Sequence, residues 1–212
     1  MPGNKNFECL LPETSNVLQV IIDKAAFLNK YVLVGGSALA LHFCHRKSED
    51  LDFFTYSDNY NKKDILDLLK VFEKSKIVNE TKDQMDIICD GVKITFFNAN
   101  WKFLKPLRKE IFNIASVESI AAMKMNVLFL RAKYRDYYDL YFIAKEKMSL
   151  YEIFKHSEKI IAGLTYKLFC IALTYIDDIE DDSVTHLEPK EYISKEEIRA
   201  FFENKILEAN AE

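Results

Sequence analysis

The chain has 212 residues, 49% of them hydrophobic, and its 29 Lys and Arg against 33 Asp and Glu give a formal net charge of -4. A chain of this size and composition can form one sizeable domain or two small ones around a substantial core. This net negative charge argues against a protein that binds nucleic acid over its whole surface. A local basic patch remains possible.

The sequence shows no targeting or membrane segment. No basic stretch near the N-terminus is followed by an apolar run of signal-peptide length, and no later segment stays apolar over the roughly 18 residues of a membrane span. We therefore expect a cytoplasmic protein without a membrane partner. The cysteines have neither a CxxC pair nor a histidine at zinc spacing, which predicts free and mostly buried thiols: Cys9, Cys44, Cys89 and Cys170.

The first half of the chain alternates helices with short strands. Hydrophobic periodicity and turn residues predict, in order, a helix over 16–30, a strand over 31–34, a helix over 37–43, a strand over 51–55, a helix over 64–72 and strands over 85–89 and 92–97. Asp90 and Gly91 separate the last two strands and form the most compact hairpin signal in the sequence. This order predicts a mixed sheet with an antiparallel edge.

The second half has an almost entirely helical pattern. Ser194 and Glu197 have the capping-box spacing at the start of its last helix. The helices are predicted over 120–130, 134–147, 150–162, 164–176 and 194–207. We therefore predict an α/β (α+β) core over residues 1–98, a connector over 99–115 and a helical region over 116–212.

Asp50 and Asp52 are the first candidates for chemistry. They lie two residues apart at a predicted strand, so both carboxylates should point to the same face. Carboxylate oxygens suit hard cations such as Mg²⁺ or Mn²⁺, which can bridge to the phosphates of a nucleotide. The structural alternative is the polar outer face of an edge strand.

A glycine turn precedes this pair of carboxylates. Gly35 and Gly36 allow the backbone to approach a phosphate closely, and the amides that open the next helix can bind an anion together with Ser37. An ordinary turn with Ser37 as helix N-cap is the alternative. Because one short helix separates the turn from the carboxylates, we expect phosphate and metal to meet at one site.

Lys124 lies in the first long helix of the second half, on a face that it shares with apolar residues. A buried ammonium group needs a partner such as a carboxylate or a triphosphate, unless its stem extends to water. Further along, Asp136 can favour the start of a helix, and Asp139 is spaced for an i,i+4 ion pair with Arg135.

Several of these motifs together resemble a known family. The turn at 35–37, the stretch 46–54 and the segments 115–124 and 135–141 are similar to signatures of the AbiEii/AbiGii toxin family, within the DNA polymerase β-like nucleotidyltransferase superfamily. The resemblance covers about residues 15–203. It implies a nucleotidyltransferase-type mixed sheet with flanking helices, followed by a C-terminal helical half.

The resemblance also implies an activity. Such a protein would be a Mg²⁺-dependent enzyme that transfers a nucleotide from a nucleoside triphosphate to an acceptor, with tRNA or another RNA as the acceptor. It would act as the toxin of a bacterial toxin-antitoxin or phage-defence system, with a cognate antitoxin as partner. By position, the family's functional residues fall on Ser37 and Arg46 for phosphate, Asp50 and Asp52 for metal, and Lys124 and Asp136 in the helical half.

One position departs from the superfamily pattern. Many members carry a third carboxylate on a later strand, whereas the candidate strand here offers Thr95, which cannot accept a proton at neutral pH. Asp136, Glu118, Asp86 or a bound water would have to replace it, and Asp86 on the neighbouring strand is the geometric alternative. Two other functions stay open, namely transfer to a small molecule of the aminoglycoside type and non-catalytic nucleotide binding.

A basic set near residue 105 is the candidate RNA contact. It is interleaved with Trp101 and Phe103, so it can combine phosphate contacts with stacking. A solvated connector is the alternative. The basic residues are Lys102, Lys105, Arg108 and Lys109.

Overall fold

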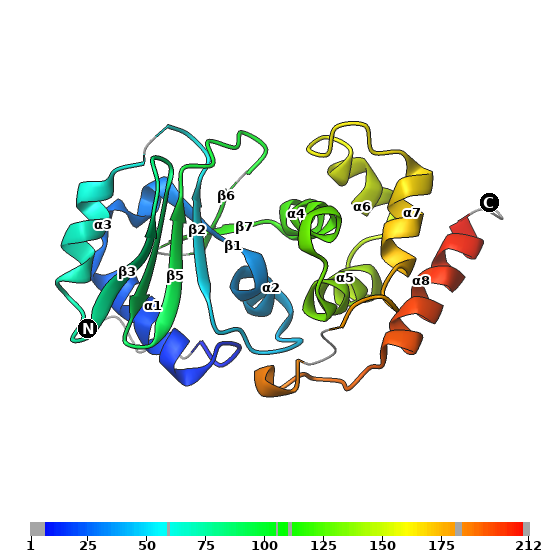
Figure 1. Ribbon diagram of the computed structural model, residues 1–212, viewed down its shortest axis with the longest axis horizontal. Coiled ribbons are helices and arrows are strands. Elements are labelled where there is room, and N and C mark those ends of the chain that lie inside the picture. Colours follow the sequence, from blue (N-terminus) through cyan, green and yellow to red (C-terminus); the bar gives the residue numbers. More distant parts are fainter. Residues whose placement is uncertain (1–6, 59, 105, 110–111, 181–183, 210–212) are drawn as a thin grey trace. The chain divides into compact units, whose positions relative to one another are not determined.

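The computed structural model describes residues 7–58, 60–104, 106–109, 112–180 and 184–209. The chain divides into two compact units, with the boundary between Ser116 and Val117. The first unit combines a sheet with helices, whereas the regular elements described in the second unit are all helices (Figure 1). The predicted fold class, an α/β core followed by a helical half, is confirmed.

The first unit contains a seven-stranded mixed sheet. Its strands are β1 Tyr31–Val34, β2 Leu51–Thr55, β3 Ser75–Glu80, β4 Gln84–Cys89, β5 Val92–Phe97, β6 Pro106–Lys109 and β7 Phe112–Ala115. They lie in the order β3-β4-β5-β2-β1-β7-β6. β1 runs antiparallel to β2 and parallel to β7, and β2 runs parallel to β5.

Helices cover the centre of this sheet on both sides. They are α1 Pro12–Lys24, the 3₁₀-helix η1 Ala26–Lys30, α2 Gly35–Phe43 and α3 Lys62–Leu69. In Figure 1, α3 lies on one side of the sheet and α2 on the other. As a result, all four residues of β1 are buried, which explains why this strand reads as a continuous apolar run.

The two faces of the sheet differ in chemistry. Residues that lie directly opposite each other on paired strands project to the same face. Phe53 and Phe96 form one such pair, with stacked rings, and the Phe27 ring of η1 packs against Phe96. The preceding pair, Asp52 and Thr95, projects to the other side, which we call the carboxylate face.

The β4–β5 hairpin turns at the predicted residues. Asp90 and Gly91 have φ angles of 47° and 89°, the left-handed backbone that makes Asp-Gly a favoured two-residue turn. β3, for which no bounds were predicted, extends the hairpin on its outer edge with all of its residues exposed.

The predicted connector over 99–115 contributes to the sheet. β7 pairs in parallel with β1, through Ile114 and Leu33, and β6 pairs with β7. The sheet unit therefore extends to Ser116 and does not end at residue 98. Both strands are four residues long, and β1, the partner of β7, lies about 80 positions earlier in the chain, so the local pattern gives little sign of them.

The second unit has a core built on α5. Its elements are α4 Val117–Arg131, α5 Tyr134–Glu146, α6 Leu150–Ser157, α7 Tyr166–Thr174, the 3₁₀-helix η2 Thr185–Leu187 and α8 Lys195–Ala209. Tyr137 and Tyr138 of α5 are buried, and their hydroxyls donate hydrogen bonds to the carbonyls of Ala172 and Glu191. Among the described residues, no helix combines the length and apolar character needed to cross a bilayer.

The predicted capping box at the last helix is present. The Ser194 amide donates to Glu197 Oε2 at 2.7 Å, and the Glu197 amide donates to Ser194 Oγ at 3.1 Å. These two bonds satisfy amide groups that have no partner inside the helix, so α8 starts where the sequence motif predicts.

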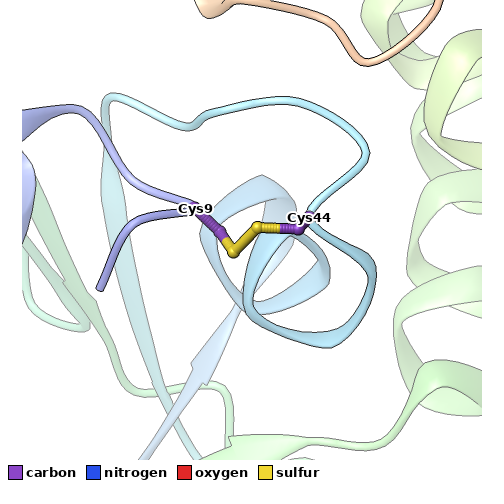
Figure 2. The surroundings of a disulfide bond; sticks show 2 residues. All are labelled: Cys9 and Cys44. Carbon is purple, nitrogen blue, oxygen red and sulfur yellow. A yellow bond between two sulfur atoms is a disulfide. The ribbon is translucent and has the colours of Figure 1, made fainter. Parts of the chain in front are cut away.

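Two of the four cysteines are joined. Cys9 and Cys44 form a disulfide with their Cα atoms 5.0 Å apart, and Figure 2 shows it linking the segment before α1 to the end of α2. The prediction of four free thiols is therefore wrong for this pair, because the fold brings together residues that are distant in the chain. Cys89 and Cys170 are free, the first buried and the second half-buried.

Candidate active site

The turn between β1 and α2 lies against Asp52. Gly35 has a φ angle of +69°, and a Cβ atom at this residue would lie 2.8 Å from Asp52 Oδ2. The carboxylate therefore lies directly beside the backbone that opens α2. The first amides of a helix and the positive end of its dipole favour negative charge at this position.

Asp50 is fixed through its backbone. The buried Ser37 hydroxyl, in the first turn of α2, donates a hydrogen bond to the Asp50 carbonyl. Asp50 and Asp52 are both half-buried, and their spacing of two residues directs them to the same side. The structure thus brings the Asp52 carboxylate and the Asp50 backbone to the glycine turn, and the Ser37 hydroxyl proton is used in a hydrogen bond to that backbone. The phosphate contact of Ser37 stays a prediction.

Arg46 covers the second glycine of the turn. Its guanidinium is buried, and Nη1 donates to the Lys47 carbonyl at 2.9 Å. A Cβ atom at Gly36 would lie 2.7 Å from Arg46 Nη2 and 3.2 Å from Ser48 Oγ, so any side chain at residue 36 would displace this group. A permanent positive charge is therefore held beside the start of α2.

The N-terminal part of the unit supports the loop that carries these residues. The Leu11 amide donates to the Ser48 carbonyl at 3.1 Å, and Thr14 Oγ1 donates to the Glu49 carbonyl at 2.9 Å. The disulfide of Figure 2 joins the same segment to the start of the loop. These contacts fix the backbone between α2 and β2, from which Arg46 and the carboxylates project.

Thr95 lies between two carboxylates on the carboxylate face. β2 pairs Asp52 with Thr95 of β5, and β5 pairs Thr95 with Asp86 of β4. Thr95 and Asp86 are each 8% exposed. Because neighbouring strands are about 4.8 Å apart, about 10 Å of sheet separates Asp52 from Asp86.

Two amide side chains fix the orientation of Asp86. Gln84 Nε2 donates to both of its carboxylate oxygens, at 2.9 and 3.0 Å, and Asn79 Nδ2 donates to Oδ2 at 3.2 Å. Among the predicted replacements for a third strand carboxylate, Asp86 is the one that the sheet register places on the same face as Asp52.

The carboxylate pair fits a magnesium-type cation. Within the described part of the chain, no group of three or more His, Cys, Asp and Glu side chains could hold a metal ion. Asp50 and Asp52 remain the predicted pair of protein donors, and a site built on them would have two carboxylates. Mg²⁺ is commonly bound by one or two carboxylates and completes its coordination with water and substrate phosphates, whereas structural zinc requires four protein ligands.

A second group of candidate residues lies in the helical unit. Lys124 Nζ of α4 is 2.7 Å from Asp136 Oδ1 and 2.7 Å from Asp139 Oδ2, both on α5. Lys124 is 8% exposed, and the two carboxylates are 1% and 0% exposed. Asp136 and Asp139 are three residues apart and share a helix face, so both reach the same ammonium.

In the described contacts, this cluster joins the Lys124 ammonium to two buried aspartates. Asp136 Oδ2 is buried and has no hydrogen-bond partner among the described residues, so it is the oxygen that remains able to accept a proton or a hydroxyl group. The contact between Lys124 and Asp139 was not predicted, since Asp139 was assigned to a pair with Arg135. The i,i+3 spacing of the two aspartates shows that they share a helix face, but it does not identify Lys124 as their partner.

The predicted basic set is described only in part. Lys105 lies outside the described residues, Lys102 is exposed, and the backbone of Arg108 and Lys109 belongs to β6. The structure thus leaves the predicted RNA contact of this set untested.

Comparison with known proteins identifies a matching family and one similar sequence. The family model described as nucleotidyl transferase AbiEii toxin, type IV TA system, matches residues 16–100 and 107–160. An uncharacterized protein of Aquifex aeolicus (strain VF5), aq_aa25, is 29% identical over 186 residues, which are 85% of this chain and 88% of that protein.

Solved structures share the fold. A protein from H. pylori described as a candidate nucleotidyltransferase superposes with a TM-score of 0.60 at 19% identity, covering 95% of this chain and 98% of its own. MenT4, the nucleotidyltransferase toxin Rv2826c of Mycobacterium tuberculosis H37Rv, superposes with a TM-score of 0.55 at 15% identity, covering 91% of this chain and 84% of its own.

Proposed function

Since this chain belongs to the AbiEii nucleotidyl transferase toxin family, we propose that it transfers a nucleotide from a nucleoside triphosphate to a hydroxyl group of RNA, with tRNA the first acceptor to test. In the cell it would act as the toxin of a toxin-antitoxin or phage-defence system, restrained by a cognate antitoxin. The observation that best supports this reaction is the position of Asp50 and Asp52 beside the first turn of α2.

The reaction is a displacement at the α-phosphorus. The acceptor oxygen forms a bond to this phosphorus, the bond to the β-phosphate oxygen breaks, and pyrophosphate leaves with the bonding electrons. The acceptor proton passes to a base. Chemistry of this kind depends on positioning and on neutralising phosphate charge.

Residues of the sheet unit would hold the phosphates. The amides that open α2 at Gly36 and Ser37 would donate to phosphate oxygens, and Arg46 would add its positive charge. Asp50 and Asp52 would hold a divalent cation such as Mg²⁺ or Mn²⁺. When bound, this ion supplies neutralisation of triphosphate charge and alignment of the attacking oxygen.

Three further residues are candidates for charge balance or proton transfer, each within its own unit. Lys124 would offset triphosphate charge, and Asp136 would orient or deprotonate the acceptor through Oδ2, the oxygen that Lys124 does not engage. Asp86 is the second candidate base, because its carboxylate is oriented on the same face as Asp52.

Substitution of the two carboxylates tests the assignment. Asp50→Asn and Asp52→Asn should abolish the labelling of total RNA by radiolabelled nucleoside triphosphates, because the amides keep the shape and remove the metal-binding charge. The matched control is Asp67→Asn, an exposed aspartate of α3 paired only with Lys70 in the described contacts, which should label RNA as the wild type does. Unchanged labelling by the Asp50 and Asp52 variants would rule the metal assignment out.

Non-catalytic nucleotide binding is the second candidate, and Thr95 opposite Asp52 is the observation that favours it. In that case calorimetry would show triphosphate binding, and no acceptor, including total RNA and small aminoglycosides, would cause pyrophosphate release. Pyrophosphate release with RNA alone would favour the proposed function over both alternatives.

A further inference from the structure

Four aromatic rings form one cluster where β2 and β5 end. The ring centroids of Phe54 and Phe97 are 5.1 Å apart, and Trp101 lies 5.6 and 6.1 Å from them. Phe103 stacks on Trp101 at 5.2 Å, with the ring planes inclined by 25°. All four side chains are partly exposed, and we call this cluster the aromatic platform.

The platform continues the carboxylate face of the sheet. Phe54 follows Asp52 by two residues on β2, and Phe97 follows Thr95 by two residues on β5, with both pairs in register. The rings therefore project to the same side as Asp52. Two residues of a strand span about 7 Å, a distance comparable to that between a phosphate and the base of the same nucleotide.

Hydrogen bonds fix the loop that presents Trp101. The Asn100 amide donates to Thr55 Oγ1 at 3.0 Å, and the Trp101 amide donates to the Thr55 carbonyl at 3.3 Å. The Leu104 amide then donates to the Trp101 carbonyl at 3.0 Å. The indole is thus carried by a backbone attached to the end of β2, the same strand that carries Asp52.

We propose that the aromatic platform binds a nucleobase of the substrate by stacking, while the carboxylates act on the phosphates. The proposal rests on the proposed nucleotidyl transfer and adds to it a base-binding surface. Flat, partly exposed rings suit this ligand because every base presents a π face, which gives affinity without sequence preference. Lys102, exposed between Trp101 and Phe103 in the chain, supplies a nearby cation for phosphate.

The protein itself provides the probe. Trp101 is its only tryptophan, so tryptophan emission, excited at wavelengths that the 11 tyrosines do not absorb, reports on this platform. In the presence of Mg²⁺, titration with ATP, GTP, CTP or UTP should quench the emission saturably if the base of the triphosphate stacks there. Titration with RNA should do so if the base belongs to the acceptor. Inorganic tripolyphosphate has the same chain of three phosphates without a base and should leave the emission unchanged.

The same samples are assayed for pyrophosphate release, which separates the two claims. Turnover without any change in emission, or equal quenching by tripolyphosphate, would overturn the stacking proposal and leave the proposed function standing. Absence of both turnover and quenching would overturn both. Quenching by nucleoside triphosphates or by RNA supports the proposal and identifies the source of the base.

Substitution of the ring gives a second readout. Trp101→Leu should raise the KM of the partner that stacks by about 5- to 100-fold with little change in kcat, whereas Trp101→Phe should restore most of the affinity. The control is Tyr192→Leu, which removes an aromatic ring that is 77% exposed in the helical unit and should leave KM unchanged. Thermal melting checks that each variant folds, and an unchanged KM in folded Trp101→Leu contradicts the proposal.

Discussion

Asp52 Oδ2 occupies the space that a Cβ atom at Gly35 would need, since the two would lie 2.8 Å apart. The glycine has a left-handed φ angle of +69° as well, so the backbone of the turn and the position of the carboxylate depend on the same residue. Alanine substitution at Gly35 and at a second glycine with a left-handed φ angle separates the backbone effect from the displacement of Asp52.

Gly35→Ala should lower transfer activity by about 100-fold, because the new methyl group displaces Asp52 and small misplacements of reacting groups have effects of this size. Gly163→Ala is the matched control, with a φ angle of +75° and no atom within 4 Å of the added Cβ. Both variants should lose about 1–2 kcal/mol of stability from the left-handed backbone. Equal activity losses in the two, measured as initial rates, would contradict the packing argument.

Lys124→Met should destabilise the fold by about 3–5 kcal/mol, because it removes the ammonium group that both buried carboxylates contact. Lys205→Met is the control, since Lys205 forms an exposed i,i+3 pair with Glu208 and its loss should change stability by less than about 1 kcal/mol. Urea unfolding measures both. A loss below about 1 kcal/mol for Lys124→Met would show that the buried cluster is not needed for folding.

Cys44→Ser should lower stability by about 3–4 kcal/mol in oxidising buffer, the chain-entropy value for a loop of this length, given the 35-residue separation from Cys9. Cys170→Ser, at a free thiol, should have a much smaller effect. Adding a dithiol reductant to the wild type should reproduce the Cys44→Ser result. Denaturation that is insensitive to the reductant would mean that the disulfide does not form in solution.

Burial raises the pKa of the Cys89 thiol to about 12, so the thiol stays protonated in the native protein at pH 8. Iodoacetamide should therefore modify Cys89 more than about 100-fold more slowly in the native chain than in the urea-unfolded chain, where the thiol titrates near 8.5. Because the folded pKa is raised, this group's contribution to stability is complete below about pH 8.5 and declines as the pH rises toward 12. Rapid native labelling, located by peptide mass, would contradict the buried assignment.

Local signals predicted the part of the fold that carries the sheet-unit site. Asp90 and Gly91 marked the hairpin, and the strand that contains Asp52 was predicted over 51–55, where the structure has β2. Asp50 lies just before this strand, so its predicted position on the same face stays a prediction. The fold class followed from the same signals, because strands and helices alternate in the first half and helices alone fill the second.

These local signals could not predict contacts between residues that are distant in the chain. The partner of Cys9 and the pairing of β7 with β1 depend on the assembled fold. The burial of Lys124 against Asp139 also required the packing of two helices. The aromatic platform is a further case, since Phe54 and Phe97 meet only through the parallel register of β2 and β5.

The most direct test of nucleotidyl transfer uses the position of the label. Purified protein is incubated with Mg²⁺, total RNA and a nucleoside triphosphate labelled at either the α- or the γ-phosphate, beside Asp50→Asn and Asp52→Asn. We expect RNA to acquire the α-label but not the γ-label, and neither variant to label RNA. Transfer of the γ-label, or α-labelling that persists in both variants, would contradict the account.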